Sequence, residues 1–304
     1  MGQTREASNW TDPRSYNLGV YNTMESVDFT KKKRVIVKVG SSTITHEATG
    51  GVDFKKLDRL VRELCDLRNQ GMDVCLVSSG AIAVGRGAIG LKERPKNLAT
   101  KQACASIGQA TLMSIYQKLF AEYSHIAGQV LMTKKTMIDN VSRKNAQNTF
   151  EELFSLGIIP VVNENDTVST YEISFGDNDT LSAIVASLTG ADALILFSDI
   201  DGLYTDNPKT NKDAKFIPVV ETIDDKILAM ASNESGSNVG TGGMATKIKA
   251  AQIACISGCD MVIANGDDIS NLHRIFENKQ VGTIFKAHQN EDVSILDLVE
   301  EMFE

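Results

Sequence analysis

The feature of this sequence that most constrains its fold is a series of short apolar runs, rich in β-branched residues, that alternate with helical stretches. Two such runs, Arg34–Val39 and Asp73–Ser78, flank the stretch Phe54–Asn69, whose leucines recur at the spacing of one helix face. Further strands are expected over 126–132, 158–163, 193–197, 215–219, 260–264 and 282–285, with helices over 99–124, 178–189 and 244–257 and a hairpin over 167–175. This pattern predicts an α/β fold with a mainly parallel sheet that helices cover on both faces.

We expect one domain between two terminal segments. Residues 1–33 are polar and lack the apolar core of a signal peptide, which predicts a flexible N-terminal extension. Residues 34–288 form the predicted domain, and residues 289–304 form an acidic, amphipathic tail. No apolar run approaches the ~20 residues that cross a bilayer. Because the formal net charge is −8, no overall basic field attracts nucleic acid. We therefore expect a cytoplasmic protein with neither membrane nor nucleic acid as a partner.

The cysteines and histidines indicate no metal centre. The five cysteines, at positions 65, 75, 104, 255 and 259, form no C-x-x-C pair, and buried thiols are the simplest interpretation. The four histidines are scattered and form no H-x-x-x-H pair. A metal cage built of side chains alone is therefore not predicted.

Unusual residues gather after the predicted strands, where open parallel sheets bind their ligands. Lys38 is costly to bury unless it meets an anion, although a lysine can also extend to solvent. Gly40 and Ser41 follow it, and consecutive backbone N–H groups in such a turn bind phosphate. The Gly-rich stretch 240–247 opens a helix and ends at Lys247, which opposes the helix dipole unless negative charge is near. Both places predict a bound phosphate; for the second, a flexible loop with an exposed lysine is the alternative.

Two clusters of Asn and Asp are the most informative motifs. They occupy 163–166 (NEND) and 176–179 (GDND), on either side of the predicted hairpin. Each alone fits turn chemistry, but together they could hold an ammonium group and a metal ion and orient lysines. The loop that begins at Ser198 and Asp199 could be a simple Asp-Gly turn, but its length suggests a loop that folds around a nucleotide. No P-loop motif is present, and the G-x-G-x-x-G pattern at 85–90 follows a helical run rather than a strand, so no dinucleotide fingerprint is predicted.

These motifs resemble those of the amino-acid kinase superfamily. The resemblance rests on KVGSS (38–42), SGA (79–81), SDIDGLY (198–204) and GGMATK (242–247). Within the superfamily, VNEND (162–166) and GDND (176–179) resemble the glutamate 5-kinases, and the similarity runs from about 34 to 288. It implies a three-layer αβα sandwich with a mainly parallel central sheet. It also implies transfer of the γ-phosphate of ATP to the γ-carboxylate of L-glutamate, the first step of proline biosynthesis, with ATP and Mg²⁺ as cofactors.

The resemblance also implies a role for each matching residue. Lys38 and Lys247 would carry the reacting phosphoryl group, and Asp179 would orient them. Glutamate would be bound by Ser79, Asn163, Asp166, Asp177 and Asn178. ATP would be held by Lys38, Gly40, Ser41, Ser198, Asp199, Thr241, Gly242, Gly243, Met244, Ala245, Thr246 and Lys247. The ATP phosphates, rather than a side-chain cluster, would carry most of the Mg²⁺ coordination.

The implied partners are a second copy of the chain, in a dimer or tetramer, proline as a feedback inhibitor and a separate glutamyl-phosphate reductase downstream. We expect no C-terminal RNA-binding-like domain, because the sequence ends soon after residue 288. Three alternatives stay open. They are a kinase for another acceptor (aspartate, N-acetylglutamate, carbamate or UMP), a non-catalytic amino-acid sensor, and a structural partner of a reductase. A sensor would be expected to lack one of the two lysines or Asp179, and all three are present.

Overall fold

The computed structural model describes residues 27–46, 49, 51–169, 177–208, 210–232 and 243–289. The strands within these residues are β1 (Arg34–Val39), β2 (Asp73–Ser78), β3 (Ala127–Met132), β4 (Ile159–Glu164), β5 (Ala193–Ser198), β6 (Leu203–Tyr204), β7 (Phe216–Ile217), β8 (Val219–Val220), β9 (Asp260–Asn265) and β10 (Thr283–Phe285). The helices are η1 (Phe29–Lys31), α1 (Ser41–Ile44), α2 (Phe54–Asn69), α3 (Ala81–Ala88), α4 (Leu98–Glu122), α5 (Lys134–Ile138), α6 (Asn140–Ser155), α7 (Asn178–Thr189), α8 (Asp225–Ser232), α9 (Met244–Ile256) and α10 (Asn271–Phe276).

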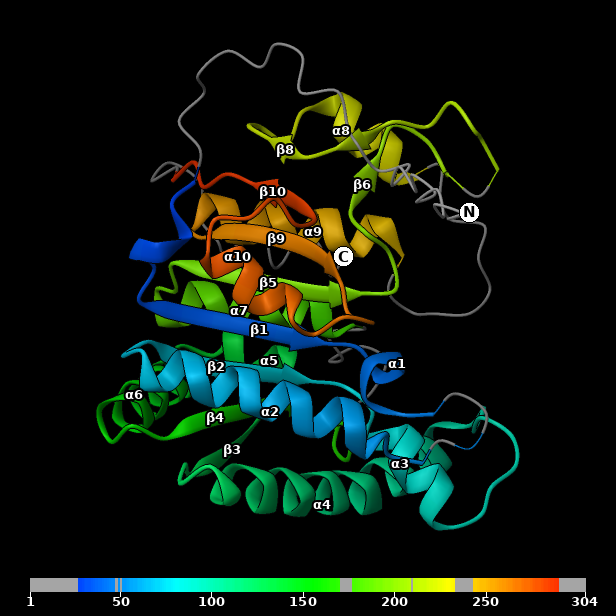
Figure 1. The fold of residues 1–304 in the computed structure, drawn as a ribbon. Coiled ribbons are helices and arrows are strands. Elements are labelled where there is room, and N and C mark those ends of the chain that lie inside the picture. Colours follow the sequence, from blue (N-terminus) through cyan, green and yellow to red (C-terminus); the bar gives the residue numbers. More distant parts are fainter. Residues whose placement is uncertain are drawn as a thin grey trace, which may run out of the picture.

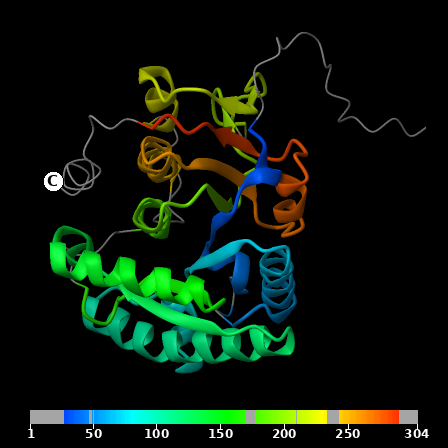
Figure 2. The ribbon, with the colours of Figure 1, turned by 90° about the vertical axis from the view of Figure 1, so that its left-hand side faces the viewer.

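One mainly parallel sheet organises these elements. Its strand order is β3-β4-β2-β1-β5-β9-β10-β8, and Figure 1 shows the strands stacked in this order from bottom to top. β10 is antiparallel to β9, and the other pairings within this sheet are parallel. In Figure 2, α2 and α10 cover one face of the sheet, and α7 and α9 cover the other. The predicted α/β fold, a three-layer αβα sandwich, is confirmed.

The single strand predicted over 215–219 is wrong. The segment forms two strands, β7 and β8, which belong to different sheets: β7 pairs antiparallel with β6, and β8 pairs with β10. Pro218 separates them. A proline has no backbone N–H and cannot donate to a ladder, so the chain changes partners at this residue.

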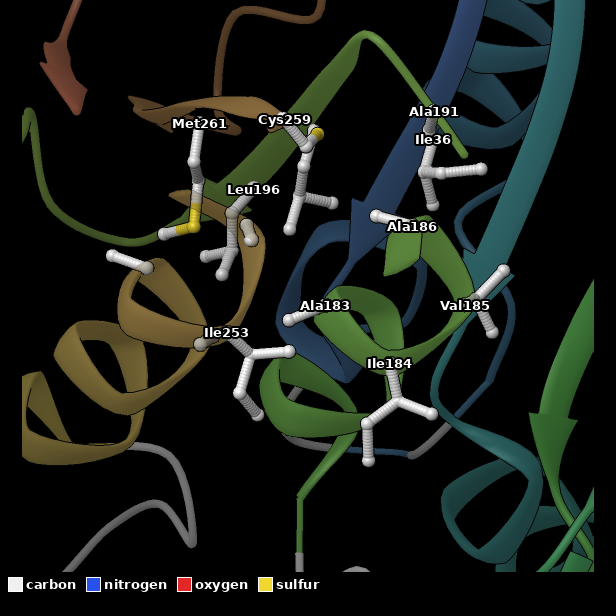
Figure 3. Close-up of a cluster of buried hydrophobic side chains, with 14 of the residues drawn as sticks. Ile36, Ala183, Ile184, Val185, Ala186, Ala191, Leu196, Ile253, Cys259 and Met261 are labelled. Atoms are coloured by element: carbon white, nitrogen blue, oxygen red, sulfur yellow. The ribbon is translucent and has the colours of Figure 1, made fainter. Parts of the chain in front are cut away.

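Alternation along β1 divides the core into two layers. Val35 and Val37 pack on the face that α2 and α10 cover, whereas Ile36 packs on the face covered by α7 and α9. Figure 3 shows this second layer, in which Ile36 and Leu196 of the sheet meet the α7 and α9 side chains. Successive side chains of a strand point to opposite faces, so Lys38 lies on the same face as Ile36. This alternation aims Lys38 toward α7.

Residues 27–33, the described part of the predicted N-terminal extension, pack against the domain. Phe29 is buried and meets the Phe276 ring edge-on, with ring centroids 6.1 Å apart. Lys32 forms an ion pair with Asp260 at the start of β9. The rest of the extension, residues 170–175 of the predicted hairpin and residues 290–304 of the tail lie outside the described residues. Residues 167 and 168 form a turn.

The cysteines and the helices bear on the predictions for disulfides and for membrane spans. All five cysteines are buried and none forms a disulfide, as predicted. Among the described helices, none is both long and apolar enough to span a membrane.

Candidate active site

The charged centre of the site is a buried carboxylate between two lysines. The oxygens of Asp179 lie 2.5 Å from Lys38 Nζ and 3.0 Å from Lys247 Nζ. The exposed fractions are 1% for Asp179, 7% for Lys38 and 4% for Lys247. Burial alone would raise the pKa of Asp179, but the two ammonium groups outweigh it and hold that pKa below its usual value. Two ammonium groups and one carboxylate leave a net positive charge, which suits an anionic ligand.

Three separate elements bring these groups together. Strand alternation places Lys38 on the face of β1 that α7 covers. Asp177 is the N-cap that precedes α7, and its carboxylate accepts a hydrogen bond from Thr180 N at 2.8 Å. This cap places Asp179 in the first turn of the helix. α9 follows Gly243 and carries Lys247 on its first turn. Residues distant in the sequence therefore meet because three element ends meet.

Next to this centre, a cluster of amides and hydroxyls closes the ends of β2 and β4. The Asn178 amide nitrogen lies 2.9 Å from Ser79 Oγ and 2.9 Å from Asn163 Oδ1. Gly80, which follows Ser79, has φ of 101°, a backbone conformation that favours glycine. The turn at Gly80 places the Ser79 hydroxyl next to the Asn178 amide. Three of the five predicted glutamate-binding residues are thus in direct contact.

The other two predicted glutamate-binding residues are carboxylates with raised pKa values. Burial, with a smaller contribution from the nearby Glu164 carboxylate, raises the pKa of Asp166 to about 7. Asp166 lies in the turn after β4. Burial also raises the pKa of Asp177. Asp177 already has a structural role, because its side chain caps α7. For Asp166, an ammonium ligand nearby would favour the ionised carboxylate.

The predicted nucleotide residues lie along the ends of β1 and β5, which are neighbours in the sheet. Ser198 ends β5, and its hydroxyl donates to Asp199 Oδ1 at 3.1 Å. Gly40 N-caps α1, and a Cβ added to it would lie 3.8 Å from Lys38 Nζ, so the ammonium group stands over this glycine. At the start of α9, Thr246 Oγ1 donates a hydrogen bond to the backbone carbonyl of Gly243 at 2.8 Å.

Of the other residues predicted to bind ATP, three lie within the described part of the chain and two lie outside it. Ser41 begins α1, Met244 is buried at the start of α9, and Ala245 is exposed. Thr241 and Gly242 lie outside the described residues.

Sequence reasoning missed the contribution of α4. Gln109 accepts a hydrogen bond from Asn163 Nδ2 at 2.8 Å, and Tyr116 Oη lies 2.8 Å from Ser78 Oγ. Gln102 is on the same side of the helix and donates to a backbone carbonyl in the segment after β4 at 3.1 Å. These three residues recur every seven positions, which keeps them on one face of the helix. α4 also carries other polar residues, among them Lys101, Gln117 and Lys118, so this spacing did not mark the three in the sequence.

The comparisons with known proteins agree with this geometry. Residues 33–265 match the amino acid kinase family. The chain belongs to the amino acid kinase family. It is 53% identical to the glutamate 5-kinase of Carboxydothermus hydrogenoformans over 253 residues, which cover 83% of this chain and 68% of that protein. It is 52% identical to the glutamate 5-kinase of Clostridium acetobutylicum, over 83% of this chain and 94% of that protein. Within the family, its similarity is therefore to the glutamate 5-kinases.

Solved structures support the fold alone. UMP kinase from Ureaplasma parvum superposes with a TM-score of 0.60 at 14% identity, covering 84% of this chain and 99% of that one. An isopentenyl phosphate kinase superposes with a TM-score of 0.55 at 18% identity, covering 83% of this chain and 100% of that one. Such low identities say nothing about the acceptor, because one fold serves many substrates.

Proposed function

We propose that this chain is a glutamate 5-kinase, which transfers the γ-phosphate of ATP to the γ-carboxylate of L-glutamate and forms L-glutamyl 5-phosphate. In this reading it catalyses the first step of proline biosynthesis. The similarity to curated glutamate 5-kinases over 83% of the chain supports the choice of acceptor. The observation that carries the chemistry is the buried Asp179 carboxylate between Lys38 and Lys247.

The reaction needs charge neutralisation more than proton transfer. The γ-carboxylate of glutamate, with a usual pKa of about 4.3, is already ionised at neutral pH, so no general base is required. The obstacle is repulsion between an anionic nucleophile and an anionic phosphate. Lys38 and Lys247 supply preorganised positive charge on the path of the phosphoryl group, and Asp179 keeps both ammonium groups in place when no phosphate is bound.

The two halves of the site suit the two substrates. We assign the polar cluster of Ser79, Asn163 and Asn178 to glutamate, with Asp166 near its ammonium group. We assign the ends of β1 and β5 and the start of α9 to ATP, through the nucleotide residues described above. Among the described residues, no group of three or more His, Cys, Asp or Glu side chains could hold a metal ion. We propose that the ATP phosphates carry the Mg²⁺, which would neutralise phosphate charge there.

Acyl-phosphate trapping tests this function. The protein is incubated with ATP, Mg²⁺ and hydroxylamine, and hydroxamate is measured with glutamate, aspartate, N-acetylglutamate or no acceptor. Release of ADP is measured in parallel with UMP, because UMP forms no hydroxamate. We expect hydroxamate with glutamate only. Product with another acceptor would change the substrate, and ATP binding without turnover on any acceptor would favour an amino-acid sensor.

Two partner predictions accompany this function. We propose inhibition of the reaction by proline and assembly into a dimer or tetramer. Inhibition of hydroxamate formation by added proline, and the molar mass in solution by light scattering, test them separately.

A further inference from the structure

α4 turns a row of polar side chains toward the amide cluster. Gln102, Gln109 and Tyr116 contact the segment after β4, the end of β4 and the end of β2, respectively. α4 is held close to α3 because both helices carry glycines at their contact. A Cβ on Gly108 would lie 1.8 Å from Ala81 O, and one on Gly85 would lie 1.8 Å from the facing backbone carbonyl. The row of side chains is therefore mounted on a tightly packed helix pair.

A backbone carbonyl fixes how Asn178 is turned. Ser78 O can only accept, so the Asn178 atom 3.2 Å from it is the amide nitrogen. The same nitrogen lies 2.9 Å from Asn163, which must present its oxygen. Asn163 then turns its own nitrogen to Gln109, which must in turn present Oε1. Which atom donates and which accepts is therefore fixed at each contact from Ser78 through Asn178 and Asn163 to Gln109.

We propose that Gln109 is a positioning residue of the acceptor site. By accepting the hydrogen bond from Asn163, it keeps the Asn163 amide turned with Oδ1 toward Asn178, so that Asn163 helps Ser78 O and Ser79 to hold the Asn178 amide in place. With the Asn178 nitrogen turned to Ser78, Ser79 and Asn163, its Oδ1 is left to accept from the ammonium group of an amino acid. The Ser79 hydroxyl, which accepts from Asn178, keeps its hydrogen for a ligand carboxylate.

Removal of the Gln109 acceptor has a defined consequence. The Asn163 nitrogen, in a side chain that is 3% exposed, loses its partner, and turning the Asn163 amide around would point two nitrogens at each other across the Asn178 contact. Asn163 would therefore no longer be a firm acceptor for Asn178, and Ser78 O and Ser79 alone would place the Asn178 amide that faces the ligand. This inference rests on the proposed function, because it explains how the acceptor amino acid is recognised.

The test compares Gln109→Met with Gln109→Glu. Met has a similar length and no strong acceptor, whereas Glu keeps an acceptor oxygen in the same place. We expect Gln109→Met to raise the KM for glutamate roughly tenfold, the effect of losing about one well-placed hydrogen bond to the ligand. The kcat and the KM for ATP should stay within about twofold of the wild-type values, because the lysine centre is untouched. Gln109→Glu should keep a wild-type KM for glutamate.

A double-mutant cycle separates positioning from general packing. In an Asn178→Ala background, Gln109→Met should raise the KM for glutamate no further, because the residue acts through Asn178. A full tenfold effect in that background, or a Gln109→Glu variant as weak as Gln109→Met, would overturn the proposal. Gln109→Leu provides a second acceptor-free variant if Gln109→Met fails to fold.

Binding measured without turnover separates this proposal from the proposed function. Calorimetric titration with glutamate gives a Kd for each variant. If the wild type binds glutamate but forms no hydroxamate, the kinase function fails, and the Kd of Gln109→Met still decides the positioning role. If the wild type is active and Gln109→Met matches it in both KM and Kd, the positioning role alone is refuted.

Discussion

The substitution Asp179→Asn isolates the role of the buried carboxylate. It keeps the size of the side chain and removes the negative charge that Asp179 places between Lys38 and Lys247. Removing one partner from a buried ion pair costs about 3–5 kcal/mol, because the two buried ammonium groups lose the carboxylate that lies between them. Each kcal/mol shifts the Tm of a domain of this size by roughly 2–4 °C. We therefore expect the variant to melt about 10 °C below the wild type in buffer without phosphate.

The pH dependence of this difference has a definite sign. The pKa of Asp179 is lowered in the folded protein, so its carboxylate stabilises the fold above the usual value of 3.8 and that contribution is lost as the pH falls through the lowered pKa. The gap between wild type and variant should hold from about pH 5 to pH 8 and close below the usual pKa. Added inorganic phosphate should stabilise the variant more than the wild type, because phosphate replaces the missing charge.

The control for this experiment is Asp177→Asn, two residues earlier. Asparagine also caps helices well, and burial raises the pKa of Asp177, so loss of its charge should leave the Tm unchanged or higher. Thermal melts followed by circular dichroism supply the measurement. A Tm for Asp179→Asn within about 2 °C of the wild type would refute the account of the centre as a charge-compensated ion pair.

Three further predictions follow. Lys247→Ala should lower kcat roughly 10²–10³-fold, by analogy with loss of an oxyanion donor, with little change in the KM for glutamate, as measured by ADP release. The kcat/KM for glutamate should fall as the pH drops through about 7, the raised pKa of Asp166. A raised pKa means that folding favours the protonated form of Asp166, so its ionised form destabilises the fold above about pH 7. At about pH 8, Asp166→Asn should therefore have a higher Tm than the wild type. The same variant should bind glutamate more weakly. A Cβ on Gly108 would lie 1.8 Å from Ala81 O, so Gly108→Ala should cost about 1–3 kcal/mol in denaturant unfolding; an unchanged midpoint would contradict the close packing of α3 and α4.

The sequence alone determined most of the elements of the sheet. β1, β2, α2 and α7 have the predicted bounds, because apolar β-branched runs and regular leucine spacing are local signals. Helices with weak local patterns were missed. α6 buries only Phe150 and Phe154, so its helical periodicity is faint until the sheet beneath it is known. α5, α8 and α10 were also not predicted.

For the site, the sequence supplied the residues and their motifs, and only the tertiary structure supplied their contacts. Lys38, Asp179 and Lys247 were singled out by cost of burial, motif and resemblance, but their distances follow from a strand order that brings β1, α7 and α9 together. Gln109 had no motif to mark it. Its role depends on one hydrogen bond to Asn163 across the space between α4 and β4, and local patterns cannot encode a contact between residues 54 positions apart. The sequence therefore decided which chemistry is available, and the packing of distant elements decided where that chemistry meets.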